Sequence, residues 1–527
     1  MPAAPVCSAA LLARFKHAAI PLGLSVAALL LALIQRPGLA ASDTKINLQL
    51  DPLTFLSDVA DVWSPTGSTG HVQGGQYGGY LLPMGPFFAI LRWIGLQPWL
   101  VQRLWLAALL AVAAWGMVAL VDNFYSPRRS WAHLAAGSFV LLNAFVVTFV
   151  NRTSVMLLAL AILPWLLVAV QKGLREPRGW KQPVVIALLI TLSGGGVNAA
   201  VTAWMLVGPA ILCGYEVLLR RVSVRALASF LLRATPVALA ASLWWIGPVL
   251  VQSAYGVDFL KFTEQPGTIW SSGSLTESLR LMGYWVSYLG VGFGNPRQAF
   301  YADTPVMLFA APVVVAGLLM AAIPILGLRW TARRTYAPFF LLLLLVGLVV
   351  MGVGWPEGTP LRKASYFAYN HFPAIQFLRS TYKAGPLVLV SLAALAGLGA
   401  DQLARFVVSQ KGPTFAIARF LLPVVALLVM ATAAWPLVRG EAIDPAVSWK
   451  AIPTAWSQTA SQLDASLSRN KRAMVLPGQL YSFYNWGATV DPILPAISDR
   501  PVVARSYVPW TDQRATDLQW TIDGLVQ

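Results

Sequence analysis

The stretch FFLLLLLVGLVVMGV, Phe339–Val353, decides the fold class, because it carries no charged residue and consists almost wholly of aliphatic and aromatic residues. Two further stretches, Ala18–Ile34 and Val237–Val251, are equally free of charge. A helix of ~20 apolar residues spans the ~30 Å hydrocarbon layer of a membrane. Inside that layer each backbone polar group must find its partner within the segment, which favours helices. These stretches therefore predict membrane-spanning helices.

The composition of the whole chain also indicates a membrane protein. Of its 527 residues, 57% are hydrophobic and 11% are charged, and the mean hydropathy is +0.64. A soluble domain could not cover so much apolar surface. The 21 tryptophans suit aromatic belts at the two membrane surfaces. The net charge of +17 would suggest nucleic acid in a soluble protein, but the basic residues lie mostly in short loops here, so we expect no nucleic-acid partner.

We expect an all-α polytopic membrane protein with about eleven transmembrane helices. Their approximate bounds are 18–35, 99–121, 134–150, 153–171, 182–199, 200–219, 230–250, 305–327, 337–354, 385–404 and 417–436. A further apolar stretch, 81–95, contains prolines and an arginine and predicts a half-helix or an interfacial segment. The first span could instead be a signal peptide, since Arg14 and Lys16 precede it and small residues follow it.

The distribution of basic residues predicts the orientation in the membrane. One set of loops is short and basic, and by the positive-inside rule it faces the cytoplasm. It contains Arg14, Lys16, Arg128, Arg129, Lys172, Arg175, Arg178, Lys181, Arg220, Arg221, Arg225, Arg329, Arg333, Arg334, Arg405 and Lys411. The longer segments, which carry the acidic residues, are 36–98, 251–304, 355–384 and the tail from 437, and we expect them on the outer face of a bacterial plasma membrane. The basic loops could dock an acidic cytoplasmic partner such as an acyl carrier protein.

The tail is more polar and predicts a second domain. We place a membrane domain at 1–436 and the beginning of an α/β outer-face domain at 437–527. Arg472–Leu476 has the pattern of a strand, and Ala515–Gln527 that of an amphipathic helix. Because the chain stops without a completed domain, we expect it to be the front part of a longer protein.

The first outer segment contains the best catalytic candidate. Asp43 lies shortly after the predicted end of the first span, so we expect its carboxylate near the membrane surface. An enzyme that transfers a sugar from a lipid phosphate needs a base for the acceptor hydroxyl, and such a base is worth ~10²–10⁴ in rate. Asp43 could equally be a solvated loop acid. Asp51 is better explained as the N-cap of a short helix that begins at Pro52.

Basic and aromatic residues of the outer segments are candidates for binding a lipid-linked donor. Cations on the outer face run against the orientation bias and suit an anionic phosphate, although contact with lipid headgroups would also explain them. The cationic candidates are Lys45, Lys261, Arg362, Lys363, Arg379 and Lys383. Tyr77, Tyr80 and Trp285 could pack against the faces of a sugar. The alternative for the glycine-rich Gly67–Tyr80 is an ordinary surface loop.

The histidines show no metal-ligand spacing, since His71, His133 and His371 are scattered along the chain. We therefore assign no metal site, although a divalent cation could bind Asp43 together with another acid of the same loop. The sequence contains no phosphate-binding glycine loop followed by Lys-Ser or Lys-Thr and no dinucleotide fingerprint. A soluble nucleotide-sugar donor is accordingly disfavoured.

Several short motifs together resemble a known family. They are Ser42-Asp43-Thr44-Lys45, Asp51-Pro52, Phe55-Leu56, Trp63-Ser64-Pro65, Gln76-Tyr77-Gly78, Pro83-Met84-Gly85-Pro86-Phe87-Phe88, Gln102-Arg103-Leu104-Trp105, Val475-Leu476-Pro477-Gly478, Tyr484-Asn485-Trp486-Gly487 and Asp491-Pro492. In these motifs, which are spread over most of the chain, the sequence resembles the actinobacterial α-(1→3)-arabinofuranosyltransferase family of the arabinogalactan and lipoarabinomannan pathway, in particular its large D-type branch.

The resemblance implies a GT-C glycosyltransferase fold, an arabinofuranose donor carried on decaprenyl phosphate, and a growing cell-wall arabinan as acceptor. It also implies that Asp43 is the catalytic base and that carbohydrate-binding modules follow the membrane part in family members. Ser64 departs from the Trp-Asp-Pro pattern expected at its position. Rival hypotheses are a transferase of another lipid-linked sugar such as mannose, a transporter of lipid-linked glycans, and a non-catalytic scaffold for cell-wall enzymes.

Overall fold

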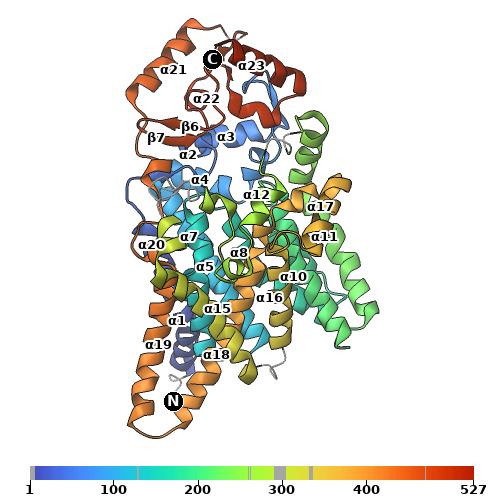
Figure 1. The fold of residues 1–527 in the computed structure, drawn as a ribbon, viewed down its shortest axis with the longest axis vertical. Coiled ribbons are helices and arrows are strands. Elements are labelled where there is room, and N and C mark those ends of the chain that lie inside the picture. Colours follow the sequence, from blue (N-terminus) through green and yellow to red (C-terminus); the bar gives the residue numbers. More distant parts are fainter. Residues whose placement is uncertain are drawn as a thin grey trace, which may run out of the picture.

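The computed structural model describes residues 6–127, 130–258, 260, 263–289, 304–331, 336–468 and 470–526. Long helices run side by side in a bundle, and smaller elements gather at one end of it (Figure 1). We call this the loop end, because the first loop (residues 34–97) and the tail (residues from 434 on) meet there. The connection between α18 (Gly385–Ser409) and α19 (Pro413–Ala433) lies at the opposite end.

The described residues contain eight spans long and apolar enough to cross a membrane and three shorter apolar helices. The eight spans are Pro98–Phe124, Trp131–Val150, Met156–Arg175, Ala199–Leu218, Val224–Tyr255, Ala311–Leu328, Thr381–Ser409 and Pro413–Ala433; the shorter helices are Ala18–Leu33, Lys181–Thr191 and Ala337–Met351. The eight spans and the three shorter helices all lie where the sequence predicts membrane spans. The mainly helical, multi-pass fold is therefore confirmed, and about eleven crossings stay a prediction.

The remaining bundle helices have the following bounds: α1 (Val6–Leu33), α5 (Pro98–Phe124), α6 (Trp131–Leu141), α7 (Ala144–Val150), α8 (Met156–Arg175), α9 (Lys181–Thr191), α10 (Ala199–Leu218), α11 (Val224–Tyr255), α14 (Thr304–Phe309), α15 (Ala311–Thr331) and α16 (Ala337–Met351). The span expected at 134–150 breaks at Asn143, whose side chain accepts a hydrogen bond from Val146 N (3.0 Å) and caps α7. The helix expected at 182–199 ends at Thr191, and Gly194 beyond it adopts a φ of +83°, which a right-handed helix excludes.

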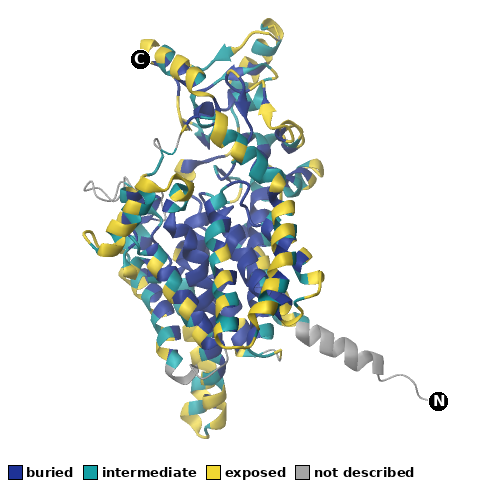
Figure 2. Cartoon of the chain, turned by 90° about the vertical axis from the view of Figure 1, so that its right-hand side faces the viewer, coloured by how far each residue is buried: buried dark blue, intermediate teal, exposed yellow. Residues whose placement is uncertain are grey.

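Buried residues fill the middle of the bundle (Figure 2), where α5, α6, α8 and α18 pack together. In contrast, α11 and α19 present large apolar side chains outward: Leu232, Leu243 and Phe420 are 75%, 62% and 73% exposed. An apolar surface of this extent is unfavourable in water. It is the surface that a membrane protein turns toward lipid.

The first loop folds into short elements: α2 (Ile46–Leu50), α3 (Pro52–Val59), β2 (Trp63–Ser64), β3 (His71–Val72), η1 (Gly78–Leu81) and α4 (Met84–Trp93). Asp51 caps α3 as predicted, because its side chain accepts a hydrogen bond from Thr54 N at 3.3 Å. The apolar stretch 81–95 forms α4, whose 10 residues are too few to cross a membrane. The strands β2 and β3 pair antiparallel, with Trp63 opposite Val72.

Two other connections contribute short elements: α12 (Pro266–Ser271), α13 (Leu275–Leu279), η3 (Trp285–Tyr288), α17 (Pro360–His371), η6 (Pro373–Arg379) and η7 (Thr381–Ala384). The tail contains α20 (Trp435–Val438), η8 (Pro445–Val447), β4 (Ser448–Trp449), α21 (Thr454–Ser466), β5 (Ala473–Met474), β6 (Ser482–Tyr484), β7 (Gly487–Val490), α22 (Leu494–Ile497), β8 (Val502–Val503), η9 (Arg505–Trp510) and α23 (Gln513–Val526). The predicted strand at 472–476 corresponds to β5, and the predicted amphipathic helix to α23.

A small sheet joins the first loop to the tail. Its strand order is β1-β4-β7-β6, where β1 (Ala40–Ala41) belongs to the first loop and the other strands to the tail. All its neighbours are antiparallel, and Ala40 stands opposite Trp449. β5 and β8 form a separate parallel pair. Because Asp43 comes two residues after the end of β1, this sheet holds the backbone close to Asp43 in place.

Candidate functional site

Asp43 is positioned by contacts from the start of α5. The side chain of Gln102 donates from Nε2 to Ala41 O (2.7 Å) and accepts from Ala41 N (2.8 Å). The buried guanidinium of Arg103 donates to Gln35 O (2.9 Å) and Leu39 O (2.6 Å). These two side chains clamp the backbone on either side of β1. The motif Gln102-Arg103 thus serves to hold the segment that presents Asp43.

The carboxylate of Asp43 is buried and bound by Ser154. Ser154 donates its backbone N–H to Oδ1 and its hydroxyl to Oδ2, both at 2.5 Å. Trp105 Nε1 in turn donates to the Ser154 hydroxyl oxygen at 3.0 Å. Burial raises the pKa of Asp43 to about 6, against the lowering effect of the Ser154 hydrogen bonds and the charge of Arg103. A carboxylate with this pKa is ionised at neutral pH and is a stronger base than an exposed aspartate.

Ser154 belongs to the α7–α8 turn (residues 151–154), which the sequence predictions overlooked. Arg152 in this turn is buried and donates to the hydroxyls of Ser287 and of Thr304 (3.3 Å), and its guanidinium lies 5.5 Å from the Tyr284 ring centroid. Asn151 is 2% exposed, and neither polar atom of its side chain has a hydrogen-bond partner among the described residues. The signal for this turn was four consecutive polar residues between two apolar stretches.

Lys383 is buried at a second point of the loop end. Its ammonium group donates to Asn198 Oδ1 at 3.1 Å and lies 5.5 Å from the Tyr382 ring centroid. The Tyr382 ring contacts Tyr284, with centroids 4.8 Å apart, so Lys383 is linked through aromatic rings to Arg152. Lys383 is thus one of the predicted cations that the structure brings into this region.

Tyr80 lies in the η1 segment, which connects the surroundings of Asp43 with those of Lys383. The η1 segment packs against the α9–α10 connection so closely that a Cβ on Gly79 would lie 2.1 Å from the carbonyl carbon of Gly196. That connection ends at Asn198, the partner of Lys383. Tyr80 itself is buried, and its pKa is raised by burial and by the nearby carboxylate of Asp43.

Lys45 and Tyr77 form part of a separate cluster. The Lys45 ammonium pairs with Asp491 Oδ1 at 2.8 Å and lies 4.7 Å and 4.6 Å from the ring centroids of Tyr77 and Trp510. Tyr77 also stacks on Tyr507, with centroids 6.1 Å apart. These contacts bind the first loop to the tail and occupy both side chains, so their predicted contact with a donor stays a prediction.

The other predicted residues are placed as follows. Arg362 donates to Gly354 O (2.6 Å) and Glu357 Oε1 (2.7 Å), and Lys363 is exposed on α17. Arg379 donates to Glu264 O (2.8 Å) and Thr263 Oγ1 (2.7 Å). Trp285 is half-buried, and within the part of the chain described its Nε1 has no hydrogen-bond partner. Lys261 lies outside the described residues.

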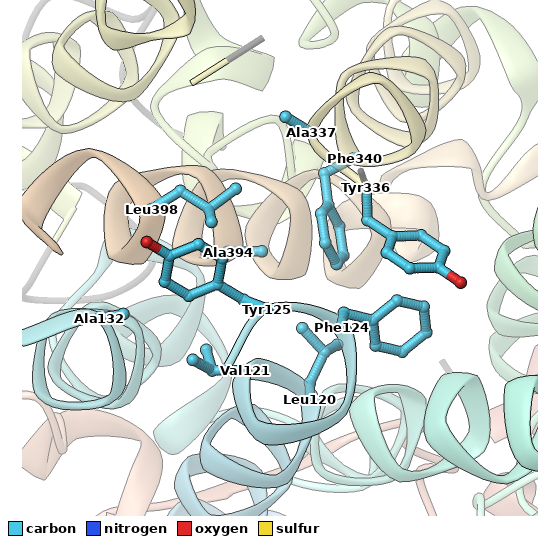
Figure 3. A pocket seen from close by; sticks show the side chains of 10 residues that line it. All are labelled: Leu120, Val121, Phe124, Tyr125, Ala132, Tyr336, Ala337, Phe340, Ala394 and Leu398. Carbon is cyan, nitrogen blue, oxygen red and sulfur yellow. The ribbon is translucent and has the colours of Figure 1, made fainter. Parts of the chain in front are cut away.

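An apolar gap lies at the end of the bundle opposite the loop end, and Figure 3 shows the side chains that line it. Phe124, Tyr336 and Phe340 are among the residues that line it, and its volume is about 10 Å³. This is room for about one water molecule, so the gap cannot hold a sugar. Across the described ranges, no three His, Cys, Asp or Glu side chains are grouped so that they could hold a metal ion.

Residues 27–524 match the family model described as "Alpha-(1->3)-arabinofuranosyltransferase, N-terminal GT-C domain". The chain belongs to this family. Proteins named α-(1→3)-arabinofuranosyltransferase from Mycobacterium tuberculosis and Mycolicibacterium smegmatis are 29% and 27% identical to it over 507 and 502 residues. Each alignment covers 92% of this chain and 34% of the relative. The chain thus spans about a third of the length of the curated relatives it matches.

The fold of the family is also seen in a solved relative. The cryo-EM structure of the arabinofuranosyltransferase AftD from mycobacteria superposes with a TM-score of 0.69 at 24% identity, over 92% of this chain and 32% of that one. This likeness confirms the expected GT-C fold. Ser64, where the resemblance led us to expect an aspartate, is buried, and its hydroxyl lies 2.9 Å from that of Thr66. Two residues of the motifs that carry the resemblance make such contacts here. Asp491 pairs with Lys45, and Gln102 donates a hydrogen bond to Ala41 O.

Proposed function

We propose that this chain is an inverting glycosyltransferase that transfers arabinofuranose from a polyprenyl-phosphate donor to a growing cell-wall arabinan. One observation carries the proposal: the buried carboxylate of Asp43, held by Ser154 at the loop end and with its pKa raised to about 6. The transferred sugar is taken from the names of the curated relatives, which are arabinofuranosyltransferases, whereas the polyprenyl-phosphate carrier and the arabinan acceptor are part of the proposal. The loop end would face outward from a bacterial plasma membrane, with residues 1–436 as the membrane domain and residues 437–527 as the start of an outer domain.

In the proposed reaction Asp43 takes the proton of an acceptor hydroxyl. The hydroxyl oxygen forms a bond to the anomeric carbon of the donor sugar from the face opposite the phosphate. The bond between that carbon and the phosphate oxygen breaks at the same time, and polyprenyl phosphate leaves with the electron pair. Attack from the opposite face inverts the anomeric configuration. Ser154 donates to both carboxylate oxygens of Asp43. These hydrogen bonds favour the ionised form and fix the orientation of the carboxylate.

We assign the donor phosphate to Lys383 and Arg152. Both are buried cations at the loop end, and both contact the aromatic pair Tyr284 and Tyr382. A cation held in place by hydrogen bonds binds an incoming phosphate without further loss of side-chain freedom. Arg362 is a weaker candidate, because its charge is already paired with the Glu357 carboxylate at 2.7 Å. A divalent cation at Asp43 and an acyl carrier protein at the basic loops stay predictions.

The proposal is tested by transfer of labelled arabinose from synthetic polyprenyl-phosphate arabinose to an arabinan oligosaccharide. We expect the purified, lipid-reconstituted protein to form product with inverted configuration and the Asp43→Asn variant to react about 10²–10⁴-fold more slowly. A polyprenyl-phosphate mannose donor serves as comparison. If the protein transfers mannose but not arabinose, the proposed donor sugar is wrong and the proposed mechanism stands. If it moves the donor across a vesicle membrane without transferring the sugar, it is a transporter.

A further inference from the structure

The tail contains a cavity that is separate from the proposed reaction centre around Asp43. Its volume is about 150 Å³, room for several water molecules. It is lined from α21, β6, η9 and the segment after β5, by Trp456, Tyr484, Gln479 and Arg505 among others. At this size, it can take one sugar ring but not a prenyl chain or a peptide segment.

One wall of this cavity is aromatic and rigid. Trp456 meets Tyr484 edge to face, with ring centroids 5.3 Å apart, and Tyr484 stacks on Trp486 at 4.9 Å with an interplanar angle of 5°. The Tyr484 hydroxyl accepts a hydrogen bond from Ile493 N at 3.1 Å, which fixes the ring. The C–H groups of a sugar ring carry a small positive charge and pack well against the negative face of an aromatic ring.

The polar groups of the cavity are available to a ligand. Arg505 is half-buried, and Gln479 is exposed at the rim. Within the described part of the chain neither side chain has a hydrogen bond or ion pair. A guanidinium group offers five N–H donors, and an amide offers donors and an acceptor. An aromatic wall with a few unused polar groups is the usual composition of a small-molecule site, and here it suits the hydroxyls of a neutral sugar.

The cavity is connected to the segment that contains Asp43 through contacts between residues 491–493 and residues 45–46. Pro492 lines it, while the preceding Asp491 pairs with Lys45, two residues after Asp43. Ile493 and Ile46 pack together in a small hydrophobic core, and Trp456 and Tyr484 of the cavity wall pack against that core. A polymer that reacts at Asp43 can therefore reach this cavity with residues behind its reacting end.

We propose that this cavity binds one neutral furanose residue of the acceptor glycan, remote from the hydroxyl that reacts. This inference rests on the proposed function for the identity of the glycan. Because only a long acceptor can fill both sites, the cavity would make the protein prefer long acceptors over short ones.

The test compares a long arabinan and a disaccharide as acceptors for the Arg505→Gln and Trp456→Leu variants. We expect KM for the long acceptor, relative to that for the disaccharide, to rise about tenfold or more, as for the loss of one charged hydrogen bond. Phe483→Ala is the matched control. Phe483 lies between Ser482 and Tyr484 on β6, is 50% exposed and does not line the cavity. Arg514→Gln on α23 controls for loss of charge.

A ratio of KM values that is unchanged in both cavity variants would overturn the proposal, and so would an equal change in the controls. If the parent protein transfers sugar to neither acceptor, the proposed function fails. The proposal for the cavity is then tested by a direct measurement of glycan binding. Calorimetric titration of the parent with unlabelled arabinan oligosaccharide should show binding that Arg505→Gln weakens. Binding that this variant leaves unaltered, or binding of inorganic phosphate in place of the glycan, would contradict a neutral-sugar site.

Discussion

Asp43 accepts two hydrogen bonds from Ser154, one from its backbone N–H and one from its hydroxyl, each 2.5 Å long. The two residues are 111 positions apart in the sequence and belong to the first loop and the α7–α8 turn. Burial disfavours the ionised carboxylate, whereas the two hydrogen bonds favour it, and burial has the larger effect on its pKa. Asp43 is thereby kept ionisable near neutral pH in a site that largely excludes water.

The pH profile of the transfer reaction should report Asp43. Its pKa is raised to about 6, and a base must be deprotonated to act. We therefore expect kcat/KM to be level above pH 6 and to fall about tenfold per pH unit below it. The control is Asp51→Asn, which removes another acid of the first loop, the cap of α3. This variant should keep both the activity and the profile. A parent profile that is flat between pH 5 and 8 would contradict the assignment of the base.

Removing the Ser154 hydroxyl should move this profile. In Ser154→Ala the carboxylate keeps the backbone N–H but loses the hydroxyl, so its ionised form is less stabilised. A hydrogen bond to a charged group contributes about 1.5–3 kcal/mol, which corresponds to roughly 1–2 pKa units. The acidic limb should therefore shift to higher pH while the plateau rate changes less.

Ser42→Ala is the matched control for this shift, because the Ser42 hydroxyl donates to Ala488 O and not to Asp43. Its acidic limb should stay where the parent has it. If Ser154→Ala lowers the rate equally at every pH, Ser154 acts on packing alone and not through the charge of Asp43.

The raised pKa of Asp43 should also be visible in stability. Its pKa in the folded protein, about 6, is above its ordinary value of 3.8, so folding favours the protonated form. The folded state accordingly loses stability as pH rises from about 4 to 6, by up to about 3 kcal/mol. We expect Asp43→Asn to melt at a higher temperature than the parent at pH 7.5, with a difference that narrows toward pH 5. A lower melting temperature at both pH values would mean that the carboxylate stabilises the fold.

The donor-binding assignment predicts a specific change in kinetics. Lys383→Gln and Arg152→Gln should each raise KM for the polyprenyl-phosphate donor about tenfold or more, because each removes a charge that binds phosphate. The KM for the acceptor should change little. Lys363→Gln is the control, since Lys363 is exposed on α17. Equal effects on donor and acceptor would point to a general loss of structure.

Much of the fold could be predicted from the sequence, because each membrane helix is encoded by its own apolar stretch. The errors lie where single residues override that pattern: Asn143 caps a new helix within an apolar stretch, and Gly194 ends α9 early. The first loop was harder. The cap at Asp51 is local and could be predicted, whereas the pairing of β1 with β4 joins residues some four hundred positions apart and has no local signal.

The site was predictable only in part for the same reason. Asp43 stood out as an acid close to the end of a span, but its partner Ser154 lies in another connection. Arg152 was not among the predicted cations, although a buried arginine between two apolar stretches needs polar partners and so marks a site. Lys45 was predicted as a donor ligand because its charge is visible in the sequence, while its partner Asp491 is visible only in the fold.

The pair of Lys45 and Asp491 provides the last prediction. Their side chains are 8% and 13% exposed, and the Lys45 ammonium also contacts the rings of Tyr77 and Trp510. Removal of one partner from a buried ion pair leaves the other charge uncompensated, which costs about 3–5 kcal/mol. We expect Asp491→Asn and Lys45→Met each to lower the melting temperature by several degrees, and the double variant to be less destabilised than the sum of the two.

The exposed pair Arg439 and Glu441, with 54% and 44% exposed side chains 3.3 Å apart, is the control for this cycle. Its removal should cost at most about 1 kcal/mol, because water already screens the two charges. If Lys45→Met keeps the parent stability but raises KM for the donor, Lys45 binds phosphate as its charge first suggested. If it destabilises the protein and the double variant recovers part of the loss, Lys45 fastens the first loop to the tail, and Asp43 depends on it for its position.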